Sequence, residues 1–129
     1  PQLLQVPRVL HAGVLTNDVY PRSVDADLQL KRGDDWDAVG VVVGDGASIG
    51  ARSVVLAGVE IGTWALVGAG STVIRDVPAH ALVVGNPAVQ KGWVGRTGKR
   101  MSQDASGLYT CPDTGDRFSE ADGVLRLLD

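Results

Sequence analysis

The chain has 129 residues with a formal net charge of −3, and its 17 glycines accompany an aromatic content of only 5%. This length predicts one domain with a small appendage, and the acidic balance argues against nucleic-acid binding, which requires a basic face. The single cysteine excludes an internal disulfide framework and fits a reducing, cytoplasmic compartment, while neither a signal peptide nor an apolar run long enough for membrane insertion is recognisable.

The first segment, residues 3–17, is an irregular stretch of six-residue units with aliphatic positions at Leu3, Val9 and Leu15. The next segment, residues 18–38, is polar and charged and is too long for a turn between short strands. We expect a loop that leaves the repeat and returns to it, and long loops in compact domains are often functional. The chain begins at Pro1 without a methionine, which indicates a processed product or a piece of a longer protein.

Six consecutive six-residue units then run from Val43 to Pro78, and each opens on an aliphatic residue: Val43, Ile49, Val55, Ile61, Val67 and Val73. The second position of a unit is usually glycine and the fifth is small. A period of six fits neither an amphipathic helix nor a long alternating strand, and it is typical of a β-helix solenoid. Three units would form one triangular coil, so residues 18 positions apart should stack. Their buried side chains would each contribute about 1.5–3 kcal/mol.

After the repeats we expect a last strand at residues 81–84 and a Gly-Asn-Pro turn. Residues 88–129 differ in character, with three short strands predicted at residues 108–111, 116–119 and 124–127 and turn sequences between them. The predicted domains are therefore an all-β solenoid over residues 1–87 and a small β-meander cap over residues 88–129. Such a cap would cover the open edge and the apolar interior of the last coil.

Two complete coils and a partial one lie near the lower limit of stability for a repeat protein. Oligomerisation would compensate, and Trp64 agrees with it because its position in the unit points outward. We expect an intersubunit contact there. The alternative is a partly covered surface tryptophan.

Two segments outside the repeats carry a closer resemblance: Leu15-Thr16-Asn17-Asp18-Val19-Tyr20-Pro21-Arg22-Ser23, and Val83-Val84-Gly85-Asn86-Pro87-Ala88 with Gly92-Trp93-Val94. Together with the repeats they resemble the hexapeptide acyltransferases, and most closely the bacterial nucleotide-sugar N-acetyltransferases. The resemblance implies a left-handed parallel β-helix and a homotrimer with sites between adjacent subunits. It also implies transfer of acetyl from acetyl-CoA to an amino group of a nucleotide-linked sugar, in the biosynthesis of surface polysaccharide such as lipopolysaccharide.

The resemblance places Asn17 near the reacting amine, where its side-chain carbonyl could accept a hydrogen bond and aim the nitrogen lone pair. The alternative is an ordinary turn in which Asn17 caps the backbone. Asp18 is either a base or an anchor of the loop, and Tyr20 lies beside it in the same segment. Arg22 suits bidentate contact with a phosphate or carboxylate, or an ion pair within the loop. These four residues are the predicted catalytic and substrate-binding set.

The coenzyme is expected on an outward strip of small residues, Ala51, Ala69 and Gly70, with Ser71 at its edge, because narrow pantetheine lies close only where side chains are small. A backbone N–H between Gly68 and Gly70 is the candidate donor to the thioester oxygen. Relatives tend to have an arginine where this chain has Val89, and Lys91 is the candidate substitute for a phosphate contact.

Metal is not expected. Many relatives end in a zinc-ribbon-like tail with paired cysteines, and the matching positions here are Gly95, Thr97, Cys111 and Thr114. One thiolate does not make a tetrahedral zinc site, so we expect a degenerate, metal-free ribbon. The two histidines, His11 and His80, lie too far apart in the sequence for the histidine cluster of metal-dependent carbonic anhydrases with this fold.

Two alternatives to N-acetyl transfer remain at this point. Members of the family usually carry several more coils before the active-site loop, so the chain could be a truncated, non-catalytic trimerisation module. An acceptor hydroxyl would make it an O-acetyltransferase, which requires a true base. His11 is the candidate for that base, and its alternative is an ordinary surface histidine.

Overall fold

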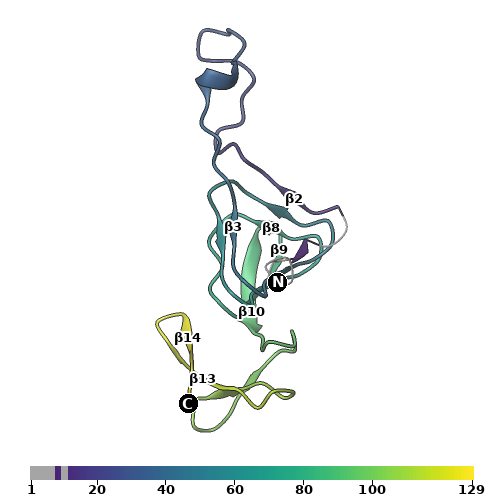
Figure 1. Cartoon of the computed structure of the whole chain (residues 1–129), viewed down its shortest axis with the longest axis vertical. Coiled ribbons are helices and arrows are strands. Elements are labelled where there is room, and N and C mark those ends of the chain that lie inside the picture. The colour runs from purple at the N-terminus through teal and green to yellow at the C-terminus, as the bar shows by residue number, and fades with distance from the viewer. Residues whose placement is uncertain (1–7, 10–11) are drawn as a thin grey trace.

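The structure, a computed structural model, describes residues 8–9 and 12–129. Figure 1 shows three parts along the longest axis: a projecting loop, a stack of triangular coils, and a small antiparallel sheet that carries the C-terminus. Strands dominate, and in the part of the chain that is described no helix is long and apolar enough to cross a membrane. The all-β architecture predicted from the six-residue period is confirmed.

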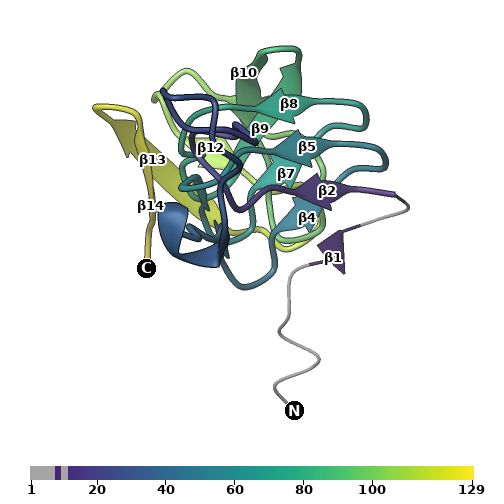
Figure 2. The ribbon, with the colours of Figure 1, turned by 90° about the horizontal axis from the view of Figure 1, so that it is seen from above.

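The coils consist of two-residue strands separated by corners. In chain order they are β1 (Arg8–Val9), β2 (Val14–Leu15), β3 (Val42–Val43), β4 (Ser48–Ile49), β5 (Val54–Val55), β6 (Glu60–Ile61), β7 (Leu66–Val67) and β8 (Thr72–Val73). They form three sheets, here called faces. Face A has the order β1-β4-β7-β9-β10, in which β9 is Ala81–Gly85 and β10 is Ala88–Trp93. Face B has the order β2-β5-β8 and face C has β3-β6. Figure 2 shows β2, β5 and β8 stacked as successive rungs of face B.

Strand pairing within the coils is parallel and follows the predicted spacing. Ile49 pairs with Val67 and Val55 with Val73, each 18 positions apart. Leu15 pairs in parallel with Val55 across the whole intervening loop, which confirms that the irregular first stretch belongs to the stack. Leu3 lies outside the described residues.

The interior is a column of small and aliphatic side chains. The members from the coils are Ala47, Ile49, Val55, Val59, Ile61, Ala65, Val67, Val73, Val77, Ala81 and Val83. Two buried hydroxyls interrupt it, and both are satisfied because Ser53 and Ser71 donate hydrogen bonds to the carbonyl oxygen of Gly68. Burial of the aliphatic column is therefore the main stabilising contribution.

Glycine at the second position of the units is explained by the close approach of successive coils. A Cβ atom on Gly44 would lie 2.6 Å from the backbone nitrogen of Thr63, and one on Gly50 would lie 2.5 Å from that of Ala69. The corner between faces B and C departs from this rule, because Leu56 and Ile74 occupy the same position there and are exposed. An apolar ridge therefore follows that corner.

The indole of Trp64 lies against the turn of the preceding coil. Trp64 adopts a left-handed backbone conformation (φ 57°), and a Cβ atom on Gly46 would collide with its ring. The residue is 37% exposed. Its ring is thus partly covered within its own chain, and the expected intersubunit contact stays a prediction.

The stack ends in a hairpin. Strand β9 (Ala81–Gly85) continues face A in parallel with β7, whereas β10 (Ala88–Trp93) returns antiparallel to β9 after the cis Asn86–Pro87 bond. The boundary predicted between residues 87 and 88 falls at the turn of this hairpin. Since β10 pairs with β9, face A extends to Trp93.

The cap contains β11 (Ser102–Gln103), β12 (Tyr109–Thr110), β13 (Arg117–Ala121) and β14 (Val124–Leu127). They form an antiparallel sheet in chain order, so the predicted meander is present, with β11 as a strand that was not anticipated.

His80 joins the cap to the coils. Its ring centroid lies 4.8 Å from that of Phe118, and its Nδ1 donates to the carbonyl oxygen of Val94 at 2.9 Å. His80 is therefore half-buried between the cap and the coils.

Candidate active site

The loop begins and ends at one point on the corner between faces B and C. The backbone N–H of Val39 donates to the carbonyl oxygen of Asn17 at 2.9 Å. On the preceding residue, the N–H of Thr16 donates to the carbonyl of Val55, and the hydroxyl of Thr16 accepts from the N–H of Ala57 at 2.8 Å. The backbone of Asn17 is therefore held from both sides, on a rigid part of the coil.

A second closure lies further out along the loop. The N–H of Lys31 donates to the carbonyl of Ser23 at 2.9 Å, and Val24 and Leu30 form an antiparallel bridge. The carboxylate of Asp25 then accepts hydrogen bonds from the backbone N–H groups at the tip. The predicted loop over residues 18–38 is thus an ordered hairpin with a closure at each end.

Asn17 and Asp18 make different contacts. The carboxylate of Asp18 accepts from the backbone N–H of Tyr20 at 2.9 Å, so the turn in this segment is capped by Asp18. Asn17 is exposed, and its side-chain amide makes no hydrogen bond to another described residue. The anchoring interpretation of Asp18 is thereby favoured, and the side chain of Asn17 is left accessible to a ligand.

A pocket of about 440 Å³, the corner pocket, opens beside Asn17. It is lined by Thr16, Asn17, Asp18, Val19, Pro21, Leu56, Ala57 and Ile74. The polar groups lie on the loop side, and the apolar ridge of Leu56 and Ile74 forms the other wall. An amide at the edge of an apolar pocket is suited to orienting a polar substrate group.

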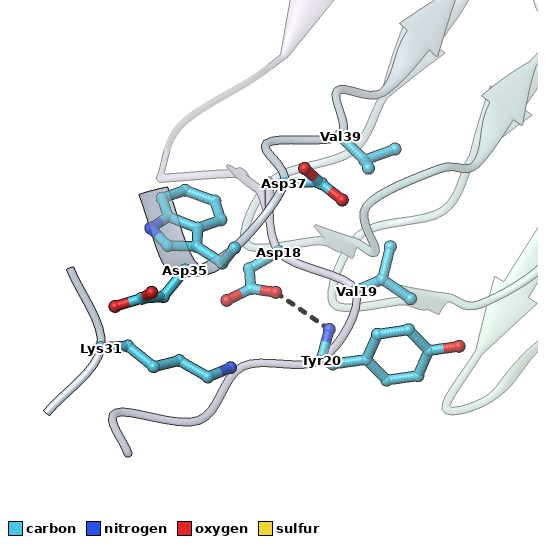
Figure 3. A pocket seen from close by; sticks show the side chains of 8 residues that line it. Asp18, Val19, Tyr20, Lys31, Asp35, Asp37 and Val39 are labelled. Carbon is cyan, nitrogen blue, oxygen red and sulfur yellow. Dashed lines mark hydrogen bonds between the residues drawn. The ribbon is translucent and has the colours of Figure 1, made fainter. Parts of the chain in front are cut away.

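A second pocket of about 470 Å³, the loop pocket, lies between the outgoing and returning arms of the loop. Its lining residues are Asp18, Val19, Tyr20, Lys31, Asp35, Trp36, Asp37 and Val39. Figure 3 shows Asp18 and Tyr20 on one arm, with Lys31, Asp35 and Asp37 on the other. A third hollow of about 430 Å³, the tip pocket, is lined by Tyr20, Arg22, Val24, Asp25, Ala26, Leu28 and Lys31.

The structure therefore brings Asn17, Asp18, Tyr20 and Arg22 into one row of pockets. Among the described residues Arg22 makes no ion pair, so nothing supports its alternative as a salt-bridge residue. Sequence reasoning missed the returning arm from Lys31 to Val39 and the ridge of Leu56 and Ile74. The signal for the ridge was present in the sequence, because those two units lack glycine at the second position.

The predicted coenzyme strip lies elsewhere on the coil. Ala51, Ala69 and Gly70 occupy the corner between faces A and B, whereas Asn17 follows β2 at the corner between faces B and C. One chain therefore does not bring the strip and Asn17 together, since face B separates them.

Within the strip the backbone is largely used by the fold. The N–H of Gly68 donates to the carbonyl of Val83 and that of Gly70 to the carbonyl of Ala51. Of the three consecutive residues Gly68, Ala69 and Gly70, only Ala69 has an N–H without a hydrogen bond to a described residue. Ser71 is buried, and its hydroxyl bonds to Gly68 and accepts from Gly85, so it is not available at the surface.

Lys91, the candidate for a phosphate contact, does not lie where Val89 lies. Val89 pairs with Val84, next to Gly68. Lys91 is exposed at the bulge of β10, further along the strand from that corner. A phosphate contact by Lys91 remains a prediction.

The four cap positions that the resemblance matched to paired cysteines, Gly95, Thr97, Cys111 and Thr114, lie close together. A Cβ atom on Gly95 would collide with the sulfur of Cys111, and the hydroxyl of Thr97 lies 3.9 Å from that sulfur. Burial raises the pKa of the Cys111 thiol, but hydrogen bonds from Thr114, Asp113 and Thr97 outweigh this and lower it to about 7. No group of three His, Cys, Asp or Glu side chains suited to a metal ion occurs among residues 8–9 and 12–129.

Comparison with known proteins identifies the repeat. Residues 40–75 match the model described as bacterial transferase hexapeptide (six repeats). The chain is 46% identical over 88 residues to dTDP-3-amino-3,6-dideoxy-alpha-D-galactopyranose 3-N-acetyltransferase of Aneurinibacillus thermoaerophilus, covering 67% of this chain and 44% of that protein. It is 44% identical over 62 residues to serine acetyltransferase 4 of Arabidopsis thaliana, covering 48% of this chain and 18% of the relative.

A solved structure agrees. The maltose O-acetyltransferase from Clostridium difficile 630 superimposes with a TM-score of 0.50 at 30% identity, over 61% of this chain and 40% of that one. The chain spans less than half the length of the curated relatives named above. Through its repeats the chain belongs to the hexapeptide-repeat transferase family, and its coils form the left-handed parallel β-helix that the resemblance implied.

Proposed function

We propose that the chain is the acetyl-CoA-dependent N-acetyltransferase part of a protein that acetylates the amino group of a nucleotide-linked amino sugar. One observation carries the proposal: Asn17 has a firmly held backbone and an accessible side chain, and it lines the corner pocket. The relative from Aneurinibacillus thermoaerophilus, which by its name acts on such a sugar, supports this acceptor class. Both proposed substrates imply a cytoplasmic enzyme, serving surface polysaccharide synthesis.

The chemistry needs few groups. The neutral amine attacks the thioester carbonyl, the carbon–nitrogen bond forms, and the carbon–sulfur bond breaks as the coenzyme thiolate leaves. Asn17 accepts a hydrogen bond from the amine and directs its lone pair, which is a contribution of orientation. The N–H of Ala69 donates to the thioester oxygen as negative charge develops on it. The proton lost by the nitrogen ends on the departing thiolate.

The separation of Asn17 from the coenzyme strip favours a site shared between copies. The strip and Asn17 border opposite edges of face B, so a neighbouring copy would place its strip against this chain's Asn17. The exposed Leu56 and Ile74 would be covered by the same contact. Repetition of one such heterologous contact closes a ring, and a homotrimer with a site at each junction is the proposed assembly.

The test is acetyl transfer to dTDP-3-amino-3,6-dideoxygalactose by the 129-residue chain and its Asn17→Ala variant. We expect kcat to fall by about 10²-fold, the scale for loss of one oriented hydrogen bond in a transition state. Oligomeric state by light scattering should not change. Asp34→Ala, an exposed loop residue that lines none of the three pockets, is the matched control. Full activity of Asn17→Ala would overturn the proposal.

A second candidate is transfer to a hydroxyl, which the serine acetyltransferase and maltose O-acetyltransferase relatives favour. That reaction needs a base, and the candidate His11 lies outside the described residues. Loss of activity in His11→Ala together with full activity in Asn17→Ala would establish it.

The non-catalytic alternative rests on the partial coverage of the relatives. Acetyl-CoA at millimolar concentration should raise the melting temperature if the chain binds the coenzyme. An unchanged melting temperature would favour a trimerisation module.

A further inference from the structure

The three pockets of the loop form a continuous row. The corner pocket and the loop pocket share Asp18 and Val19, and the loop pocket and the tip pocket share Tyr20 and Lys31. The row starts at Asn17 and ends beyond the second closure of the loop. An elongated ligand with one end at Asn17 would therefore run outward along the two arms.

Charge changes sign along this row. Carboxylates line the loop pocket, from Asp18, Asp35 and Asp37, and cations line the tip pocket, from Arg22 and Lys31. Lys31 lines both pockets, and Figure 3 shows its side chain extending from the returning arm toward the arm that carries Asp18 and Tyr20. Neither cation makes an ion pair with a described carboxylate. The acidic part of the row thus lies nearer Asn17 than the basic part.

Most of the carboxylates already have a structural role. Asp18 caps the turn at Tyr20, and Asp35 accepts from the backbone N–H of Arg32 at 2.8 Å. Asp25, the carboxylate in the tip pocket, is occupied by two backbone N–H groups of the tip turn. Asp37 differs, because its carboxylate makes no hydrogen bond within the described part of the chain. Asp37 is therefore the acidic group free to meet a ligand.

On the basis of the proposed function, we infer that the loop recognises its acceptor through the order of acidic and basic side chains along the row of pockets. Asp37 binds the ammonium form of the amino sugar in the loop pocket, and Lys31 with Arg22 binds the diphosphate that links the sugar to its nucleoside. Trp36, half-buried in the same pocket, offers a flat apolar surface to the sugar ring. The ammonium loses its proton to solvent, and the neutral amine then reaches Asn17. A diphosphate between two cations is stabilised by charge-assisted hydrogen bonds.

The inference separates two binding contributions, which single variants can measure. In calorimetric titration, dTDP, which has the diphosphate but lacks the amino sugar, should bind about ten-fold more weakly to Lys31→Gln and to Arg22→Gln, the scale for one charge-assisted hydrogen bond. Asp37→Asn should leave dTDP affinity unchanged. It should raise the KM for dTDP-3-amino-3,6-dideoxygalactose by about ten-fold, by the same reasoning for one ion pair. The KM for acetyl-CoA should stay constant in all three variants.

Matched controls come from the cap. Arg126→Gln removes a positive charge and Asp122→Asn a negative charge, both in the cap and far from the loop (Figure 1). Both variants should behave like the parent chain. The inference is overturned if the parent binds neither dTDP nor UDP at millimolar concentration, if both cation variants bind dTDP like the parent, or if Asp37→Asn keeps the parental KM. Acetyl transfer with unaffected loop variants would refute the charge order alone. Binding of dTDP that depends on Lys31, without any transfer, would refute the proposed reaction and leave the binding row standing.

Discussion

The backbone N–H of Val39 donates a 2.9 Å hydrogen bond to the carbonyl oxygen of Asn17. This contact joins the two ends of the loop, so the chain re-enters the coil where it left it. Leu15 consequently keeps its pairing with Val55 although the loop intervenes. Asn17, which is proposed to orient the amine, thus lies at the boundary between the coil and the loop.

Thr16 supports Asn17 through its hydroxyl, which accepts the N–H of Ala57 at 2.8 Å. Thr16→Val should leave that partly buried N–H without a partner and lower the free energy of unfolding by about 1–3 kcal/mol. Thr16→Ser keeps the hydroxyl and should restore most of the loss. Denaturant titration of both variants measures the difference, and equal stability of the two would contradict the role given to this bond.

Gly44 should not tolerate a side chain, because its Cβ would lie 2.6 Å from the backbone nitrogen of Thr63 in the next coil. Gly44→Ala should destabilise the fold by about 3 kcal/mol, the upper part of the range for overpacking. Gly40→Ala is the control, since a Cβ there meets nothing within 4 Å. Thermal unfolding followed by circular dichroism compares them. A parental melting temperature for Gly44→Ala would show that the coils separate more easily than described.

His80 should hold the cap against the coils. His80→Ala removes the hydrogen bond to the carbonyl of Val94 and the ring contact with Phe118, for a combined loss of about 2 kcal/mol. Hydrogen exchange should become faster in β12 and β13 and stay unchanged in β5 and β7. Uniform acceleration across both sets of strands would mean that cap and coils unfold as one unit.

Cys111 should make stability depend on pH in the alkaline range. Its folded-state pKa, about 7, lies below the ordinary value of 9.0. Between these values the unfolded chain binds a proton that the folded chain has released, so stability rises with pH. The contribution is complete above pH 9 and is lost as pH falls through 7. Urea midpoints at pH 7 and pH 9 should therefore differ in the parent chain and converge in Cys111→Ala; an unchanged pH dependence in the variant would assign it to other groups.

The coils could be predicted from the sequence because their pattern is local and repeated. Each six-residue unit carries its own aliphatic residue, and the fixed period determines that Ile49 stacks on Val67. The turn sequences around Gly115 and Gly123 likewise indicated the meander, since such turns depend on a few adjacent residues.

The remaining features depend on contacts between distant residues. The second closure of the loop joins Ser23 to Lys31, and no period or motif marks that pair. β10 was missed because its pairing with β9 follows from a chain reversal rather than from its own composition. For the candidate site, periodicity predicts Ala69 on an outward corner, but it carries no information that face B separates that corner from Asn17.

The antiparallel pairing of β10 with β9 closes one end of the solenoid. A coil added after β9 would have to pair with a strand that runs the wrong way, so the stack is closed to extension on that side. An insertion between existing coils, in steps of 18 residues, avoids that end and keeps the aliphatic residues on their column. Duplication of residues 50–67 is the shortest change that would raise the height of the molecule while leaving the loop, the terminal hairpin and the cap intact.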